Sequence, residues 1–151
     1  MKVYTLRRQQ TVPPPRAEVF AFFANAANLE RLTPPWLRFS VRTPTPIAMR
    51  VGTKIDYTIR WHGLPMRWTA EIVEWSPEEH FVDMQVRGPY RFWLHRHRFI
   101  DAPGGGTVIA DELQYALPLG WLGRFAHVAL VRRDIDRIFD YRVAQVSAIL
   151  G

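Results

Sequence analysis

The sequence contains no cysteine, which excludes disulfide bonds, thiolate nucleophiles, zinc fingers and iron–sulfur clusters. Lysine is nearly absent as well, since Lys2 and Lys54 are the only two and arginine carries the remaining positive charge. No apolar run approaches the roughly 20 residues that cross a bilayer. The first residues also lack the apolar core of a signal peptide. We therefore expect a soluble, cytoplasmic protein.

Several chemical motifs are missing too. The one glycine-rich stretch, Gly104–Gly106, separates two strand-like segments and is not followed by a helical pattern. This context indicates a hairpin turn and not a phosphate-binding loop. The serines lack the Gly-x-Ser-x-Gly context of a hydrolase. We expect no cofactor.

What the chain does contain is an ordinary globular composition. Its 151 residues are 48% hydrophobic and 23% charged, which suits one domain over residues 1–151. The formal net charge is +6, but the arginines are scattered, so we do not expect a nucleic-acid partner. Arg7, Arg8, Arg96 and Arg98 predict a basic outer sheet face. Such a face is either simply solvated or suited to transient contact with an anionic membrane.

Apolar and polar residues alternate along most of the chain, with the period of two that is typical of β-strands. Proline and glycine interrupt the alternation and mark the turns. The expected strands span residues 2–10, 37–42, 53–62, 66–73, 81–87, 91–101 and 107–117.

Helical periodicity occurs in two places. Residues 16–24 and 26–32 predict two short helices between the first and second strands. After Pro118 the period changes from 2 to 3.6, which predicts one long helix from about Trp121 to Leu150. The stripe that we expect to face the sheet begins with Trp121, Leu122 and Phe125. The order predicts an α+β fold, in which a curved antiparallel sheet of about seven strands wraps around the C-terminal helix and encloses a pocket.

The segment Gly88–Phe99 places a Gly-Pro turn before a strand that contains His-x-His. Together with the element order, this segment makes the whole chain resemble the SRPBCC superfamily. That group includes START lipid-transfer domains, the birch pollen allergen family and polyketide cyclases, and the chain is most similar to a bacterial group of small ligand-binding domains. Further matching stretches are Trp68, Ile72 and Pro77, then Phe81–Val86, then Asp111 and Tyr115–Pro118. The resemblance implies a helix-grip fold with a hydrophobic cavity, but no single reaction.

Strand parity indicates which side chains face the cavity. Trp93, His95 and His97 share one face of their strand, and Arg96 and Arg98 share the other. Because arginine pairs belong in water, we expect the histidine face to point inward.

Strand pairing then brings polar residues together on this inner face. The glycine turn places His97 roughly opposite Asp111, and the Gly-Pro turn places Asp83 near His95. We expect His97 to lie within hydrogen-bond reach of Asp111 or Tyr115, and His95 to lie near Asp83. The residues that we expect to line the pocket are Tyr57, Trp61, Trp68, Phe81, Asp83, Gln85, Trp93, His95, His97, Asp111 and Tyr115.

The two aspartates and two histidines allow several roles. The first is a structural polar network, and the second is to orient a ligand. The third is acid–base catalysis, in which Asp83 pairs with His95 and His97 pairs with Asp111. We do not expect a metal site, since no cysteine or His-x-x-x-His motif supports one.

Three functions follow from this interpretation. We favour a soluble carrier or sensor for a small hydrophobic molecule, because the architecture forms a pocket and the sequence lacks an established catalytic motif. The second is a cyclase- or dehydratase-like enzyme that uses the Asp–His pairs. The third is an interaction protein whose pocket is vestigial and filled by tryptophan. The sequence leaves the oligomeric state open.

Overall fold

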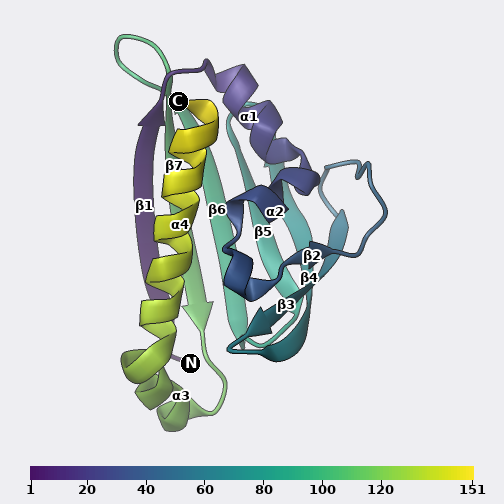
Figure 1. Cartoon of the computed structure of the whole chain (residues 1–151), viewed down its shortest axis with the longest axis vertical. Helices are drawn as coiled ribbons and strands as arrows, with labels where there is room; N and C mark the ends of the chain where they lie inside the picture. The colour runs from purple at the N-terminus through teal and green to yellow at the C-terminus, as the bar shows by residue number, and fades with distance from the viewer.

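The computed structural model describes the backbone of all 151 residues and every side chain except that of Val128. The strands form one sheet, and the long C-terminal helix runs across it (Figure 1). The elements are β1 (Tyr4–Val12), α1 (Arg16–Ala24), η1 (Ala26–Asn28), α2 (Leu29–Leu32), η2 (Pro35–Leu37), β2 (Ser40–Val41), β3 (Lys54–Trp61), β4 (Leu64–Ser76), β5 (His80–Arg87), β6 (Phe92–Asp101), β7 (Thr107–Ala116), α3 (Gly120–Ala126), η3 (His127–Val131) and α4 (Arg132–Leu150).

The seven strands pair in the order β1-β7-β6-β5-β4-β3-β2, and every pairing is antiparallel. Tight turns make this meander possible. Gly106 follows the β6–β7 turn with φ 82°, and its Cα lies so close to the Val12 carbonyl oxygen that no Cβ would fit there. The predicted helix-grip fold is confirmed, including the short helices between β1 and β2.

The predicted strand over residues 37–42 is wrong for most of its length. Pro35–Leu37 form a 3₁₀ turn, and Arg38 adopts a left-handed conformation with φ 46° that ends it. Only Ser40 and Val41 pair with β3. Pro35 at its start favours a turn over an extended strand, and the alternation that begins at Leu37 does not register this preference.

The predicted C-terminal helix is interrupted. α3 is separated from α4 by a π-helical turn over His127–Val131. This turn changes the phase of the helix, so the predicted apolar stripe does not continue into α3. Trp121, Leu122 and Phe125 are 70%, 48% and 72% exposed, not packed on the sheet as predicted. α3 projects past the end of the sheet (Figure 1).

Two apolar clusters hold the helices against the sheet. One joins α1 to the strands through Val19, Phe20 and Phe23, which pack with partners that include Phe81 and Phe99. The other joins α4 to β1 and β7, and contains Leu6, Leu113, Tyr115, Val131, Ile135 and Phe139. Burial of each large apolar side chain stabilises the fold by roughly 1.5–3 kcal/mol.

The predicted basic outer face needs a correction. Arg8 follows Arg7 directly, so the two side chains point to opposite sides of β1. Arg8 accordingly reaches α4, where its guanidinium lies 3.0 Å from Asp136.

Within the part of the chain that the structure describes, no helix is both long and apolar enough to cross a membrane.

Candidate functional site

A cavity of about 480 Å³, partly open to the surface, lies between the sheet, α4 and the short helices. Its walls are mostly apolar and come from nearly every element, including Leu32 of α2, Ile55 of β3, Ile72 of β4 and Phe139 of α4. A cavity of this size suits a small organic ligand. Eight of the eleven predicted residues line it: Tyr57, Trp61, Trp68, Phe81, Asp83, Trp93, His95 and His97.

Aromatic rings form a continuous part of the wall. Tyr57 stacks on Trp68 with centroids 5.7 Å apart, and Trp93 meets Trp68 edge to face at 4.9 Å. The Trp68 Nε1 atom is buried and has no hydrogen-bond partner among the described residues. Burial raises the pKa of Tyr57, and the charge of Asp83 raises it further, so the phenol stays neutral.

One region of the wall is polar, on strands β5 and β6, and it is hydrogen-bonded to Asp111 of β7. His95 Nε2 lies 2.8 Å from Asp111 Oδ1, and His97 Nε2 lies 2.7 Å from Asp83 Oδ2. The two imidazole rings are 3.7 Å apart, and both histidines are buried. We call Asp83, His95, His97, Asp111 and Arg142 the polar network.

The inward histidine face and the strand register agree with the sequence analysis, and the hydrogen bonds follow a pattern that it did not specify. His97 is the register partner of Asp111, and His95 is that of Asp83. The hydrogen bonds nevertheless join the diagonal neighbours, and His97 Nδ1 remains 3.5 Å from Asp111 Oδ1. The physical reason is that strand side chains lean along the strand, which brings long side chains within reach of diagonal partners.

Arg142 completes the polar network from the opposite side, and the sequence analysis missed it. Its guanidinium lies 3.4 Å from His97 Nδ1 and 4.0 Å from Asp111 Oδ1. A signal was available, because Ile135, Phe139, Arg142 and Val146 follow the spacing of one helical stripe. An arginine within an apolar stripe calls for a buried partner.

These contacts define the protonation of His97. Arg142 can only donate, so Nδ1 accepts its hydrogen bond, and the ring proton on Nε2 is donated to Asp83. Burial lowers the pKa of His97 to about 4, with help from the neighbouring His95 and Arg142, while Asp83 opposes the shift. His97 is therefore neutral near pH 7.

Both carboxyl groups are held in the ionised form. Burial by itself raises the pKa of Asp83, but the hydrogen bond that His97 donates and nearby positive charge, including that of Arg142, outweigh it and lower the pKa. For Asp111 burial is likewise opposed, chiefly by the charge of Arg142 and then by His95, and its pKa falls well below the ordinary range. Asp83 lines the cavity, whereas Asp111 does not.

Three predicted residues lie outside the cavity wall: Gln85, Asp111 and Tyr115. The side chain of Gln85 forms two hydrogen bonds with the backbone of Tyr90, at 2.7 and 3.1 Å, and so holds the β5–β6 turn. The Tyr115 hydroxyl is 2.7 Å from His127 Nε2 at the π-helical turn. Asp111 is buried and hydrogen-bonded to His95. Parity places these residues on the inner face, but their polar atoms have partners elsewhere.

The polar network also contains atoms with the spacing of a metal site. Ligand atoms of Asp83, His95 and His97 all lie within 4.8 Å of one another. Arg142 places a fixed positive charge beside them, which disfavours a cation. The hydrogen bonds already described also occupy the Nε2 atoms, so the arrangement fits a hydrogen-bond network better than a coordination sphere.

Comparisons with known proteins agree with this architecture. A sequence profile described as "Polyketide cyclase / dehydrase and lipid transport" matches residues 12–139. A search of curated proteins found no significant match. Among solved structures, a protein from Chromobacterium violaceum superimposes with a TM-score of 0.73 at 14% identity, over 97% of this chain and 96% of that one.

Two plant proteins share the fold as well. Major latex-like protein 151 from Panax ginseng gives a TM-score of 0.69 at 12% identity, over 98% of this chain and 97% of that one. A norcoclaurine synthase point mutant from Thalictrum, in complex with a transition-state analogue, gives 0.71 at 11% identity, over 99% and 94%. Identities this low support the fold alone.

Proposed function

The chain belongs to the family of polyketide cyclases, dehydrases and lipid transport proteins, and on that premise we propose that it binds a small hydrophobic molecule as a carrier or sensor. This membership agrees with the resemblance to the SRPBCC superfamily found in the sequence. The observation that carries the proposal is the cavity of about 480 Å³, whose wall is mostly apolar and holds charged side chains only at the polar network and at Asp134. Removing a small apolar ligand from water into such a cavity is favourable.

The polar network indicates the chemistry of one end of this ligand. Asp83 is the carboxylate of the polar network that lines the cavity, and its side chain keeps 21% exposure. A ligand hydroxyl or N–H group could donate to it, whereas an anionic group would be repelled. The ligand that fits best has an apolar, ring-bearing body and one hydrogen-bond donor.

An enzyme of the cyclase or dehydratase kind is the second candidate, because an Asp–His pair lines the cavity and because a norcoclaurine synthase shares the fold. The protonation states favour binding over catalysis. Both ring nitrogens of His97 already have partners, and the lowered pKa of Asp83 makes it a weak base near neutral pH. The vestigial-pocket alternative is disfavoured, since tryptophan side chains line the cavity without filling it.

Titration with the neutral fluorescent probe N-phenyl-1-naphthylamine tests the binding function. We expect saturable binding to the wild-type chain and at least about tenfold weaker binding to Trp93→Ala, which loses part of the aromatic wall. Trp36→Ala is the matched control, because Trp36 is 49% exposed and lies outside the cavity. Equal binding by both variants would contradict the proposal. If the probe binds as expected, native mass spectrometry of protein purified from its own host would identify the ligand class.

A further inference from the structure

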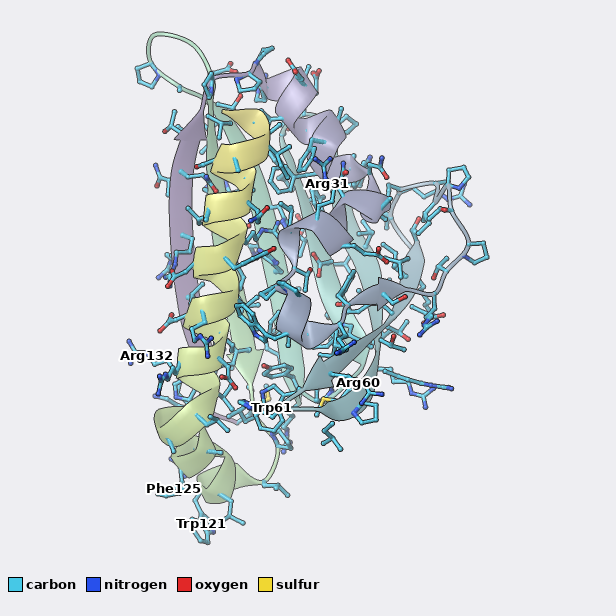
Figure 2. The ribbon with its side chains drawn as sticks, viewed as in Figure 1. Arg31, Arg60, Trp61, Trp121, Phe125 and Arg132 are labelled. Atoms are coloured by element: carbon cyan, nitrogen blue, oxygen red, sulfur yellow. The ribbon has the colours of Figure 1, made fainter. Side chains whose placement is uncertain are left out.

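We propose that the projecting end of α3 docks on the surface of an anionic lipid bilayer. Four large apolar side chains are exposed there: Leu119 (73%), Trp121 (70%), Leu122 (48%) and Phe125 (72%). We call these four residues the α3 tip. Trp121 and Phe125 are one helical turn apart and point away from the rest of the molecule (Figure 2). Water-exposed apolar side chains clustered in this way mark an interaction surface.

The α3 tip adjoins a groove of about 370 Å³ whose charged residues are all basic. Lys2, Arg91 and Arg124 line it, and no acidic residue is among the described residues that do so. None of these three forms an ion pair within the described part of the chain, so their charges remain available to a partner. Cationic side chains beside an apolar tip match the negative headgroups that overlie the acyl region of an anionic bilayer.

The basic face that the sequence predicted is less suited to this role. Arg7 lies 3.3 Å from Glu112, Arg8 lies 3.0 Å from Asp136, and Arg96 lies 3.6 Å from Glu74. These neighbouring carboxylates reduce the attraction of that face for anionic lipids. Its arginines also have no exposed aromatic tip beside them that is comparable with the α3 tip. The unpaired charge and the apolar surface therefore coincide at α3.

The α3 tip also lies at the entrance of the cavity. Leu119 and Leu122 line the cavity while remaining exposed, and Leu117 lines both the cavity and the basic groove. Gly123 holds α3 in this position, because its Cα packs too closely on the Pro118 carbonyl oxygen for a Cβ to fit. Docking through the tip would turn the cavity entrance toward the bilayer. Only this consequence, exchange of ligand with the membrane, rests on the proposed function.

A bilayer explains both features at once. A free phosphate would use the basic groove but would not need an exposed tryptophan and phenylalanine. Tryptophan favours the interface between headgroups and acyl chains, and phenylalanine favours the acyl side of it. A single shallow tip with a few cations gives reversible binding.

Vesicle co-sedimentation with the full chain tests the proposal. The vesicles are pure phosphatidylcholine, or contain about one-third phosphatidylglycerol. We expect the wild-type chain to bind the anionic vesicles at least about tenfold more tightly, with binding that weakens as salt rises. The double variant Trp121→Ser/Phe125→Ser should lose at least about tenfold in affinity for the same vesicles. The matched control Val51→Ser/Leu64→Ser removes comparably exposed apolar side chains elsewhere and should bind like the wild-type chain.

A second pair of variants separates the basic groove from net charge. Arg91→Gln/Arg124→Gln should lose the preference for anionic vesicles, whereas Arg50→Gln/Arg67→Gln removes the same charge elsewhere and should retain most of it. Absence of binding by the wild-type chain, unchanged binding by the tip variant, or equal losses in both charge variants would overturn the proposal. Circular dichroism checks that each variant folds. Probe binding in solution is measured separately, so failure of docking and failure of ligand binding remain distinguishable.

Discussion

His97 donates a 2.7 Å hydrogen bond to Asp83, although the strand register places His97 opposite Asp111. This diagonal connection has a functional consequence. It leaves Asp83 on the cavity wall beside its partner His97, while Asp111 lies outside the wall and is hydrogen-bonded to His95. The two carboxylates therefore have different roles, one toward a ligand and one toward the interior of the fold.

Asp83→Asn and Asp111→Asn should separate these roles. Loss of the Asp111 charge leaves Arg142 without its buried counterion, so we expect the free energy of unfolding to fall by about 2–4 kcal/mol. Asp83→Asn should instead weaken binding of 2-naphthol by about tenfold and leave binding of naphthalene nearly unchanged, since only the first donates a hydrogen bond.

Urea unfolding and a displacement assay with the naphthylamine probe measure these two effects. Asp101→Asn is the control, because its side chain is 75% exposed and lies outside the cavity. A parallel loss of affinity for both naphthalenes in Asp83→Asn would show that Asp83 acts on the cavity's shape and not through a hydrogen bond.

Arg142→Met should destabilise the fold by about 2–4 kcal/mol, because it leaves the buried Asp111 and the partly buried Asp83 with no fixed positive charge beside them. Methionine keeps much of the packing that Arg142 makes over the Phe23 ring. Arg133→Met on the exposed side of α4 is the control and should change stability by less than about 0.5 kcal/mol. Equal stability of the two variants would mean that the carboxylates are stabilised without Arg142.

Much of this architecture was predictable because the apolar residues that face the interior recur in the sequence with a regular period. Alternation predicted the strands from β3 to β7, and the Arg96 and Arg98 positions correctly oriented His95 and His97. Both features depend on whole segments, in which the positions of many residues indicate the same buried face. The cavity-lining aromatics followed from the same parity.

What the sequence did not reveal depends on local geometry or on contacts between distant elements. The π-helical turn contains one more residue than an α-helical turn and so rotates α3 relative to the apolar stripe of α4. No residue type in His127–Val131 indicates this turn in the sequence. The outcome was that Trp121 and Phe125 were predicted to be buried. The diagonal hydrogen bonds and the approach of Arg142 need side-chain directions that period-two alternation does not contain.

Tyr115→Phe tests whether the π-helical turn is held by its hydrogen bond. The change leaves His127 Nε2 buried without its 2.7 Å partner, so we expect a loss of about 1–2 kcal/mol and faster amide exchange in α3. Tyr4 still stacks on the His127 ring at 3.5 Å and should keep the turn from unfolding completely. Tyr141→Phe, on the far part of α4, is the control. Unchanged exchange in α3 would show that packing alone positions the tip.

Stability should fall as the pH falls from 6.5 toward 4. The pKa of His97 drops from an ordinary 6.5 to about 4 in the folded chain. Between these values the unfolded chain binds a proton at His97 that the folded chain does not bind. The free energy of unfolding therefore decreases with decreasing pH, by an amount on the order of 1–3 kcal/mol. Below about pH 4 this contribution is complete, and protonation of Asp83 and Asp111, whose folded pKa values are lowered, continues the loss.

His97→Gln should flatten this dependence, because glutamine can fill the space but does not titrate. The measurement is urea unfolding of both proteins at several pH values between about 4 and 7. His127 also has a lowered pKa and adds a slope of the same sign, so the variant should keep a shallower dependence and not lose it entirely. His80→Gln is the control, since His80 lies outside the cavity on the exposed end of β5. If His97→Gln kept the full slope of the wild-type chain, His97 would not be the neutral group that the polar network requires.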